Sequence, residues 1–267
     1  MIKIQFLDIW HIMWIMIYIV STVLLCIWLK QKSVAFQKKV VYSIIIVNFI
    51  LHFLAPWFIQ ETTQAFIIRV TMVNVCAVLI FLSPFLYWQK DKFLKPGWLY
   101  MCIIGSLGLL IFPEYAIGHD PFSLNILRLF IQHLLLLYVP IIMIVLGHEN
   151  IRYRDTWTSC VLYIIILIIV IANDAILQVL GVVHDMRWLN GAFQWHPGSL
   201  YFIANALAPN VFLTIPIGPN AGEFMHWPIF YMMPIIILFI FPLSIIITGG
   251  LLLAKKYLDK GTIPPSL

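Results

Sequence analysis

Long apolar runs, each about as long as a membrane helix, alternate along the chain with short polar segments. A transmembrane helix needs about 20 mostly apolar residues. Runs of this kind lie near residues 9–29, 40–59, 65–88, 98–117, 124–147, 158–180 and 228–254. The pattern predicts an all-α fold: a polytopic membrane helical bundle of about seven transmembrane helices. We expect it to form a single integral membrane domain over residues 1–267.

The composition agrees with a chain that lies mostly in lipid. Hydrophobic residues make up 63% of the 267 residues, charged residues make up 10%, and the mean hydropathy is +0.99. A soluble domain has about a quarter charged residues, so these few charges could not cover a water-facing surface of this size. The formal net charge of +5 is interpreted as a topology signal and not as a sign of nucleic-acid binding.

Basic residues gather on alternate connections between the predicted helices. Twelve of the 16 lysines and arginines follow the first, third, fifth and seventh runs: Lys30, Lys32, Lys38, Lys39, Lys90, Lys92, Lys95, Arg152, Arg154, Lys255, Lys256 and Lys260. Cytoplasmic connections of membrane proteins carry an excess of such residues. We therefore predict a multi-pass protein of the cell membrane, with its N-terminus outside, its C-terminus in the cytoplasm and an extracellular loop at 181–227. Membrane lipids are the expected partners, nucleic acid is not, and the oligomeric state stays open.

Polar residues inside the predicted spans share one depth. Ionisable side chains within a bilayer are costly and commonly mark functional sites. With the orientation above, the polar residues that fall in the outer half of the bilayer are His52, Arg69, Asn74, Cys76, Arg128, Gln132, His133, Asn173, Asp174 and Gln178. This common depth predicts a polar site in the outer half of the bundle.

Helical spacing and simpler explanations bear on which of these residues form the site. Arg69 and Cys76 are seven residues apart, so we expect them on one face of the third span. Arg128 and Gln132 are four apart and share a face of the fifth span. A lone cysteine in a span is also a common apolar filler, and an arginine also reaches toward the interface. Spacing alone leaves both interpretations open.

The sequence contains no pattern that predicts a cofactor. Cys26, Cys76, Cys102 and Cys160 fall in different apolar runs without a CxxC pair, so neither a disulfide framework nor a zinc site is predicted. The loop at 181–227 contains histidines and acidic residues, but none at helical metal-ligand spacing. The chain carries no nucleotide, haem or flavin motif. We expect no metal and no cofactor.

Three stretches of the chain carry a resemblance to a known family. They are MVNVCAVLIFLSPFLYW in the third span, LRLFIQHLLLLYVPI with one early histidine, and ANALAPN followed by MHWPIFYMM, and they lie between about residues 70 and 235. They resemble the YwaF-like integral membrane proteins of bacteria, distant relatives of eukaryotic transmembrane acyltransferases that remodel ether phospholipids. The last motif keeps Trp227, Pro228 and Tyr231, whereas Ala206 and Ala208 stand where the family has an aromatic residue and a lysine.

The resemblance implies acyl transfer by a cysteine on one helix and a histidine on another. At the matching positions stand Cys76 and His133. The function hypothesis is therefore a membrane-embedded lipid acyltransferase or acyl-ester hydrolase that uses this Cys–His pair in the outer half of the bilayer. The residues expected to bind substrate are Arg69, Asn74, Arg128, Gln132 and Asp174. Two other classes stay open: a transporter or small-molecule carrier, and a non-catalytic accessory membrane protein.

Overall fold

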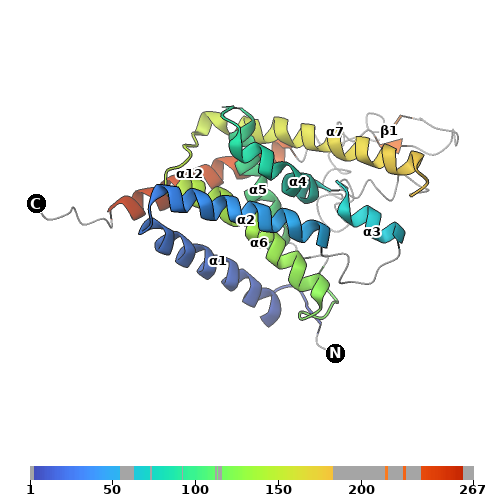
Figure 1. Ribbon diagram of the computed structural model, residues 1–267, viewed down its shortest axis with the longest axis horizontal. Coiled ribbons are helices and arrows are strands. Elements are labelled where there is room, and N and C mark those ends of the chain that lie inside the picture. Colours follow the sequence, from blue (N-terminus) through green and yellow to red (C-terminus); the bar gives the residue numbers. More distant parts are fainter. Residues whose placement is uncertain are drawn as a thin grey trace, which may run out of the picture.

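The computed structural model is built almost entirely of helices (Figure 1). It describes residues 3–54, 63–72, 74–91, 93–111, 113, 116–182, 214–215, 225–226 and 236–260. Its helical elements are α1 (Ile9–Lys30), α2 (Val34–Leu54), α3 (Thr63–Val70), α4 (Val75–Trp88), α5 (Leu94–Ile111), α6 (Leu124–Val145), the 3-10 turn η2 (Tyr153–Asp155), α7 (Trp157–Val179), the π-helical turn η4 (Ile236–Ile240) and α12 (Phe241–Lys260). Within the described residues, six helical segments are long and apolar enough to cross a membrane, and α4 is a shorter apolar helix. The predicted polytopic helical bundle is confirmed.

One end of the bundle collects the basic connections (Figure 1). Lys95, in the first turn of α5, forms an ion pair with Glu149 in the connection after α6, with a nitrogen–oxygen distance of 2.6 Å. Lys255 of α12 reaches the same connection and donates a hydrogen bond to Asn150 Oδ1 at 3.0 Å. Segments that the sequence analysis assigned to the cytoplasm therefore meet at a single end, which we call the basic end.

The opposite end holds the start of the first helix. The Ile4 N–H donates to the His119 carbonyl at 3.0 Å. His11, in the first turn of α1, donates from Nε2 to the Leu110 carbonyl at 2.7 Å. α1 therefore begins beside the end of α5, whereas α12 ends at the basic end (Figure 1). The first and last helices start and finish at opposite ends, as an odd number of crossings requires.

α5 lies at the centre of the bundle. Residues 97–104 are all buried, and α5 packs against α4, α6 and α7. Gly97 permits the close approach of α7, because a Cβ at this position would lie 2.7 Å from the Thr158 carbonyl oxygen. Small residues let helix backbones approach closely in membranes. In contrast, α1, α2 and α12 expose many large apolar side chains, as helices that face lipid do.

Paired hydroxyl groups join helices in the half of the bundle next to the basic end. The Tyr100 and Thr248 hydroxyls lie 2.6 Å apart and link α5 to α12. The Ser159 and Ser244 hydroxyls lie 2.8 Å apart and link α7 to α12. Hydrogen bonds of this kind hold membrane helices together, each contributing about 0.6 kcal/mol on average. Each of these hydroxyls has a hydrogen-bond partner on a neighbouring helix. A structural role, holding the helices together, is therefore sufficient to explain these polar residues.

The third span differs from the single helix predicted at 65–88. α3 ends at Val70, and α4 begins at Val75 after an extended residue, Asn74, whose side-chain oxygen accepts the Ala77 N–H at 2.8 Å. Asparagine is among the preferred residues at this capping position. The 14 residues of α4 rise about 21 Å, less than the roughly 30 Å core of a bilayer. α4 alone is therefore too short to cross the bilayer.

The fourth span is shifted along the chain by several residues. The helix predicted at 98–117 runs from Leu94 to Ile111. It begins earlier because Asp91 accepts the backbone N–H groups of Phe93 and Leu94, at 2.7 Å each, and so starts the helix within the basic connection. It ends before Pro113, which cannot continue a helix.

The predicted loop at 181–227 lies mostly outside the described residues. Its described part includes two short strands, β1 (Thr214–Ile215) and β2 (Met225–His226), which pair antiparallel. The last span, predicted at 228–254, is described from residue 236 onward as η4 and α12. The predictions for 183–213 and for the start of the last span fall outside the described residues.

Candidate functional site

Cys76 lies in the first turn of α4, the helix that begins inside the bundle. Its side chain is partly buried. Gly105 of α5 faces it, because a Cβ added at Gly105 would lie 3.3 Å from the Cys76 sulfur. The thiol therefore lies directly against the backbone of the central helix.

The start of α4 also presents backbone N–H groups beside the thiol. The Ala77 N–H donates to the Asn74 side chain at 2.8 Å, and the Val78 N–H donates to the Asn74 carbonyl at 3.1 Å. The N–H groups of Val75 and Cys76 lie in the first turn, where the helix has no carbonyl one turn earlier to accept from them. Such N–H groups, at the positive end of the helix dipole, stabilise negative charge.

His133 of α6 has one ring nitrogen engaged by its own helix. Nδ1 lies 2.8 Å from the carbonyl oxygen of Leu129, one turn earlier. A carbonyl only accepts, so Nδ1 carries the proton of the neutral ring and Nε2 keeps its lone pair. The ring is partly exposed. Nε2 is therefore the ring nitrogen that can accept a hydrogen bond or a proton.

Tyr18 of α1 connects the surroundings of the thiol to those of the histidine. Its buried hydroxyl donates to the Phe130 carbonyl of α6 at 2.5 Å. The same hydroxyl is close enough to Cys76 for the two groups to interact electrostatically. Phe130 lies one helical turn before His133, so Tyr18 ties α1 to the part of α6 that carries the histidine.

A second group of buried polar side chains lies between α2 and α6, and we call it the α2–α6 seam: Asn48 and His52 of α2 with Arg128 and Gln132 of α6. The Asn48 side chain donates to the Gln132 carbonyl at 3.0 Å. Asn48, His52 and Gln132 are each at least nine-tenths buried. Within the described part of the chain, Asn48 Oδ1, His52 Nε2 and Gln132 Nε2 have no hydrogen-bond partner. Buried polar atoms without partners are costly, so these atoms mark a place for a polar ligand or water.

Arg128 gives the seam a positive charge. Its guanidinium donates to Asn125 Oδ1 at 3.2 Å. It also interacts electrostatically with the imidazoles of His52 and His133, so the seam adjoins the side of α6 that carries His133. Guanidinium groups bind carboxylates and phosphates through two parallel hydrogen bonds.

Of the other residues predicted for the site, one caps a helix and two have side chains outside the described residues. Asn74 caps α4 with its side-chain oxygen. The side chains of Arg69 and Asp174 lie outside the described residues, although their backbones belong to α3 and α7. The expected common face of Arg69 and Cys76 does not exist, because the helix is interrupted between them. Asn173 of α7 donates to Thr71 Oγ1 at 3.5 Å and links α7 to this interruption.

Three residues of the site were not predicted from the sequence. Asn48 stands four residues before His52, so helical spacing already places both on one face of α2, and this signal was present in the sequence. Tyr18 and Gly105 leave no such signal. Tyr18 binds a backbone carbonyl on a distant helix, and Gly105 matters only for the space it leaves free.

Comparison with known proteins identifies the family. The sequence model of the TMEM164 family, a family of membrane proteins, matches residues 6–246, nearly the whole chain. No curated protein and no solved structure matches the chain.

Proposed function

The chain belongs to the TMEM164 family, and we propose that it is a lipid acyltransferase or acyl-ester hydrolase of the cell membrane that uses Cys76 and His133. One observation carries the proposal: the thiol lies in the first turn of a helix that is too short to cross the membrane alone and that begins after an interruption of the third span. That place combines N–H donors, the positive end of a helix dipole and access to lipid esters. The resemblance to YwaF-like proteins at the Cys76 and His133 motifs supports the same reaction.

The first half of the reaction transfers an acyl group to the protein. The Cys76 thiol gives its proton to His133 Nε2, and the sulfur attacks the carbonyl carbon of a lipid ester. A carbon–sulfur bond forms, and the carbon–oxygen bond to the lipid alcohol breaks. The leaving alkoxide takes the proton from His133. The products are a Cys76 thioester and a lipid with one fewer acyl chain.

The second half of the reaction returns the acyl group to an acceptor. His133 takes a proton from an acceptor hydroxyl, whose oxygen attacks the thioester carbon. A carbon–oxygen bond forms, the carbon–sulfur bond breaks, and the proton returns to the sulfur. With a lipid hydroxyl as acceptor the reaction is acyl transfer, and with water it is hydrolysis.

Two groups of donors have distinct tasks in this scheme. The N–H groups of Val75 and Cys76 stabilise the oxyanion of each tetrahedral intermediate; loss of one such donor costs about 2.7–4 kcal/mol in a well-studied hydrolase. The α2–α6 seam holds the polar part of the lipid. Arg128 and Gln132 donate to a phosphate, and Asn48 accepts from a hydroxyl.

The interior below the seam favours an enzyme over a transporter. Toward the basic end, the buried residues next to the seam on α2 and α6 are apolar, namely Val41, Ile45, Leu136 and Val139. The buried Gln37 at the start of α2 is engaged by carbonyls of the α1–α2 turn. A carrier needs a polar path to the second side of the membrane, and at this interface of the described residues the path is closed by side chains.

The test is lipid turnover by the purified protein in proteoliposomes, measured by mass spectrometry of released fatty acids and newly acylated lipids. We expect Cys76→Ala to abolish turnover and His133→Gln to lower it by about 100-fold, the usual contribution of a general base. The matched control is Cys102→Ala, which removes a fully buried thiol from α5 and is expected to keep turnover. Full turnover by Cys76→Ala would sink the Cys–His mechanism.

A further inference from the structure

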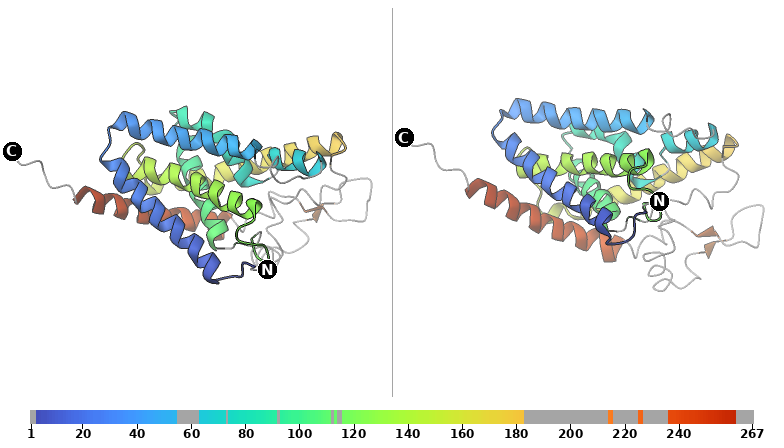
Figure 2. Two further views of the ribbon diagram at one scale, coloured as in Figure 1. Left: turned by 60° about the horizontal axis from the view of Figure 1, so that its bottom comes forward. Right: turned by 90° about the horizontal axis from the view of Figure 1, so that it is seen from below.

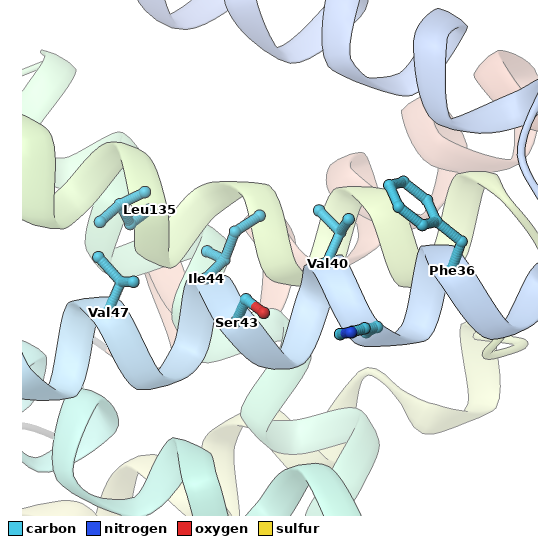
Figure 3. A pocket seen from close by; sticks show the side chains of 7 residues that line it. Phe36, Val40, Ser43, Ile44, Val47 and Leu135 are labelled. Carbon is cyan, nitrogen blue, oxygen red and sulfur yellow. The ribbon is translucent and has the colours of Figure 1, made fainter.

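A lateral groove runs along α2 beside α6, on the outer surface of the bundle. It encloses a cavity of about 310 Å³. Figure 3 shows its apolar wall, formed by Phe36, Val40, Ile44 and Val47 in one row along α2 and by Leu135 of α6. These side chains point into the gap that α1 crosses (Figure 3).

The groove exists because two consecutive helices separate after their connection. α1 and α2 are joined by residues 31–33, and Gln37 fixes this turn by donating to the carbonyls of Leu29 and Lys32 at 2.9 and 3.0 Å. The rings of Trp28 and Phe36 meet edge to face, with centroids 5.7 Å apart. From this closed apex the two helices diverge (Figure 2). Beyond this apex α1 leaves the face of α2 that carries the groove uncovered, so the groove opens sideways toward lipid.

The dimensions of the groove match one acyl chain of one leaflet. From Phe36 to Val47 the helix rises about 17 Å, and one leaflet of the hydrocarbon core is about 15 Å thick. The wall is apolar along this length, so water is disfavoured there, and an apolar chain fills the space without leaving a polar group unpaired.

A cation stands at the end of the groove where a headgroup would lie. Lys39, one helical turn before Ser43, lines the groove, and both side chains are exposed. A lysine near a helix end extends its amine to the membrane interface, where lipid phosphates lie. The charge at this end complements an anionic headgroup and the apolar wall complements its chain.

We propose that the groove along α2 and α6 binds one phospholipid from the leaflet at the basic end, with an acyl chain along α2 and its phosphate on Lys39. This lipid is separate from the substrate of the Cys76 site, because its phosphate lies at the basic end, whereas the α2–α6 seam lies near the opposite end of α2. The proposal therefore stands independently of the acyltransferase function.

The test uses the full chain in nanodiscs that contain phosphatidylglycerol with a photoactivatable diazirine on one acyl chain. After illumination, cross-linked peptides are quantified by mass spectrometry. We expect cross-links to concentrate on Val40, Ile44 and Val47 of α2, well above those on Ile246 and Leu253, exposed apolar residues of α12. Equal cross-linking of both helices would mean ordinary surrounding lipid and would overturn the proposal.

Two substitutions separate the headgroup contact from the chain contact. Lys39→Ala is expected to lower groove cross-linking about fivefold, the factor for one basic residue near an anionic membrane surface. The matched control is Lys256→Ala, an exposed lysine of α12 near the same end, which is expected to leave groove cross-linking unchanged. Ser43→Trp fills the groove and is expected to abolish it. Unchanged groove cross-linking in both Lys39→Ala and Ser43→Trp, or peptides of a second copy cross-linked across the groove, would contradict the proposal.

Discussion

Replacing Gly105 by alanine tests whether the thiol of Cys76 lies against the central helix. The added methyl carbon would lie 3.3 Å from the sulfur, closer than the roughly 3.5–4.0 Å of an ordinary contact. The sulfur must therefore move by about 0.5 Å. A misplacement of about 1 Å in a reacting group costs roughly 100-fold in rate, so half of that distance predicts a loss of about tenfold in acyl transfer.

Gly108→Ala is the matched control, because nothing lies within 4 Å of a Cβ at Gly108. Both substitutions place alanine in α5, and both gain up to about 1 kcal/mol of helix propensity. The difference between the two variants therefore isolates the contact with the sulfur. We expect both to fold, and only Gly105→Ala to slow acyl transfer in the proteoliposome assay.

The rate at which a small methanethiosulfonate reagent labels Cys76 gives a readout that does not depend on enzymatic activity. It is measured in a background in which the other three cysteines are replaced by alanine. Gly105→Ala is expected to slow the labelling several-fold and Gly108→Ala to leave it unchanged. If the two alanine variants label at the same rate, the packing of Cys76 against Gly105 is refuted.

Three further predictions concern packing, capping and pH. Gly97→Ala places a methyl group 2.7 Å from the Thr158 carbonyl oxygen, so the melting temperature should fall, by the equivalent of about 1–3 kcal/mol for overpacking; an unchanged value would contradict the close α5–α7 contact. Asn74→Ala should lose about 1 kcal/mol of stability and Asn74→Ser should keep it, because serine also caps helices and carries no charge; denaturation midpoints check this. Burial and the charge of Lys38 lower the pKa of His148, so the folded protein resists protonation at this ring, and stability should be full above about pH 6.5 and fall below it. His148→Gln should remove the part of this stability loss that comes from His148, measured as melting temperature against pH. A pH profile identical to that of the unmodified protein would contradict this assignment.

The alternation of basic connections predicted the layout of the bundle well. Basic residues are in excess on cytoplasmic connections whichever helices touch. The sequence was therefore enough to predict that these connections lie at one end. The ion pair of Lys95 with Glu149 and the bond of Lys255 to Asn150 agree with that layout. The orientation across the membrane, with the N-terminus outside, stays a prediction.

The interruption of the third span could not be predicted from hydropathy. The run from 65 to 88 is apolar throughout its second half, and a window average does not register a local change of backbone conformation. Asn74 is a preferred capping residue, but in a membrane span it is equally a polar residue between helices. The break matters because it turns Cys76 from a residue in mid-helix into one in the first turn of a helix.

Contacts between helices determine the rest of the candidate site. Local sequence patterns do not predict which helices touch. Spacing placed Arg128 and Gln132 on one face of α6, yet it could not indicate that Asn48 of α2 donates to the Gln132 carbonyl. The role of Gly105 depends on the approach of α4 to α5. Only the packed structure brings these groups together.

The most direct test of the account is the detection of an acyl thioester on Cys76. The protein is incubated in liposomes with an acyl-labelled phospholipid, quenched in acid, and digested for mass spectrometry with and without hydroxylamine, which cleaves thioesters. We predict one acyl group on the peptide that contains Cys76, sensitive to hydroxylamine and absent in Cys76→Ala. An unmodified Cys76 in protein that turns lipid over, or a label that persists elsewhere in Cys76→Ala at the same level, would contradict the central claim.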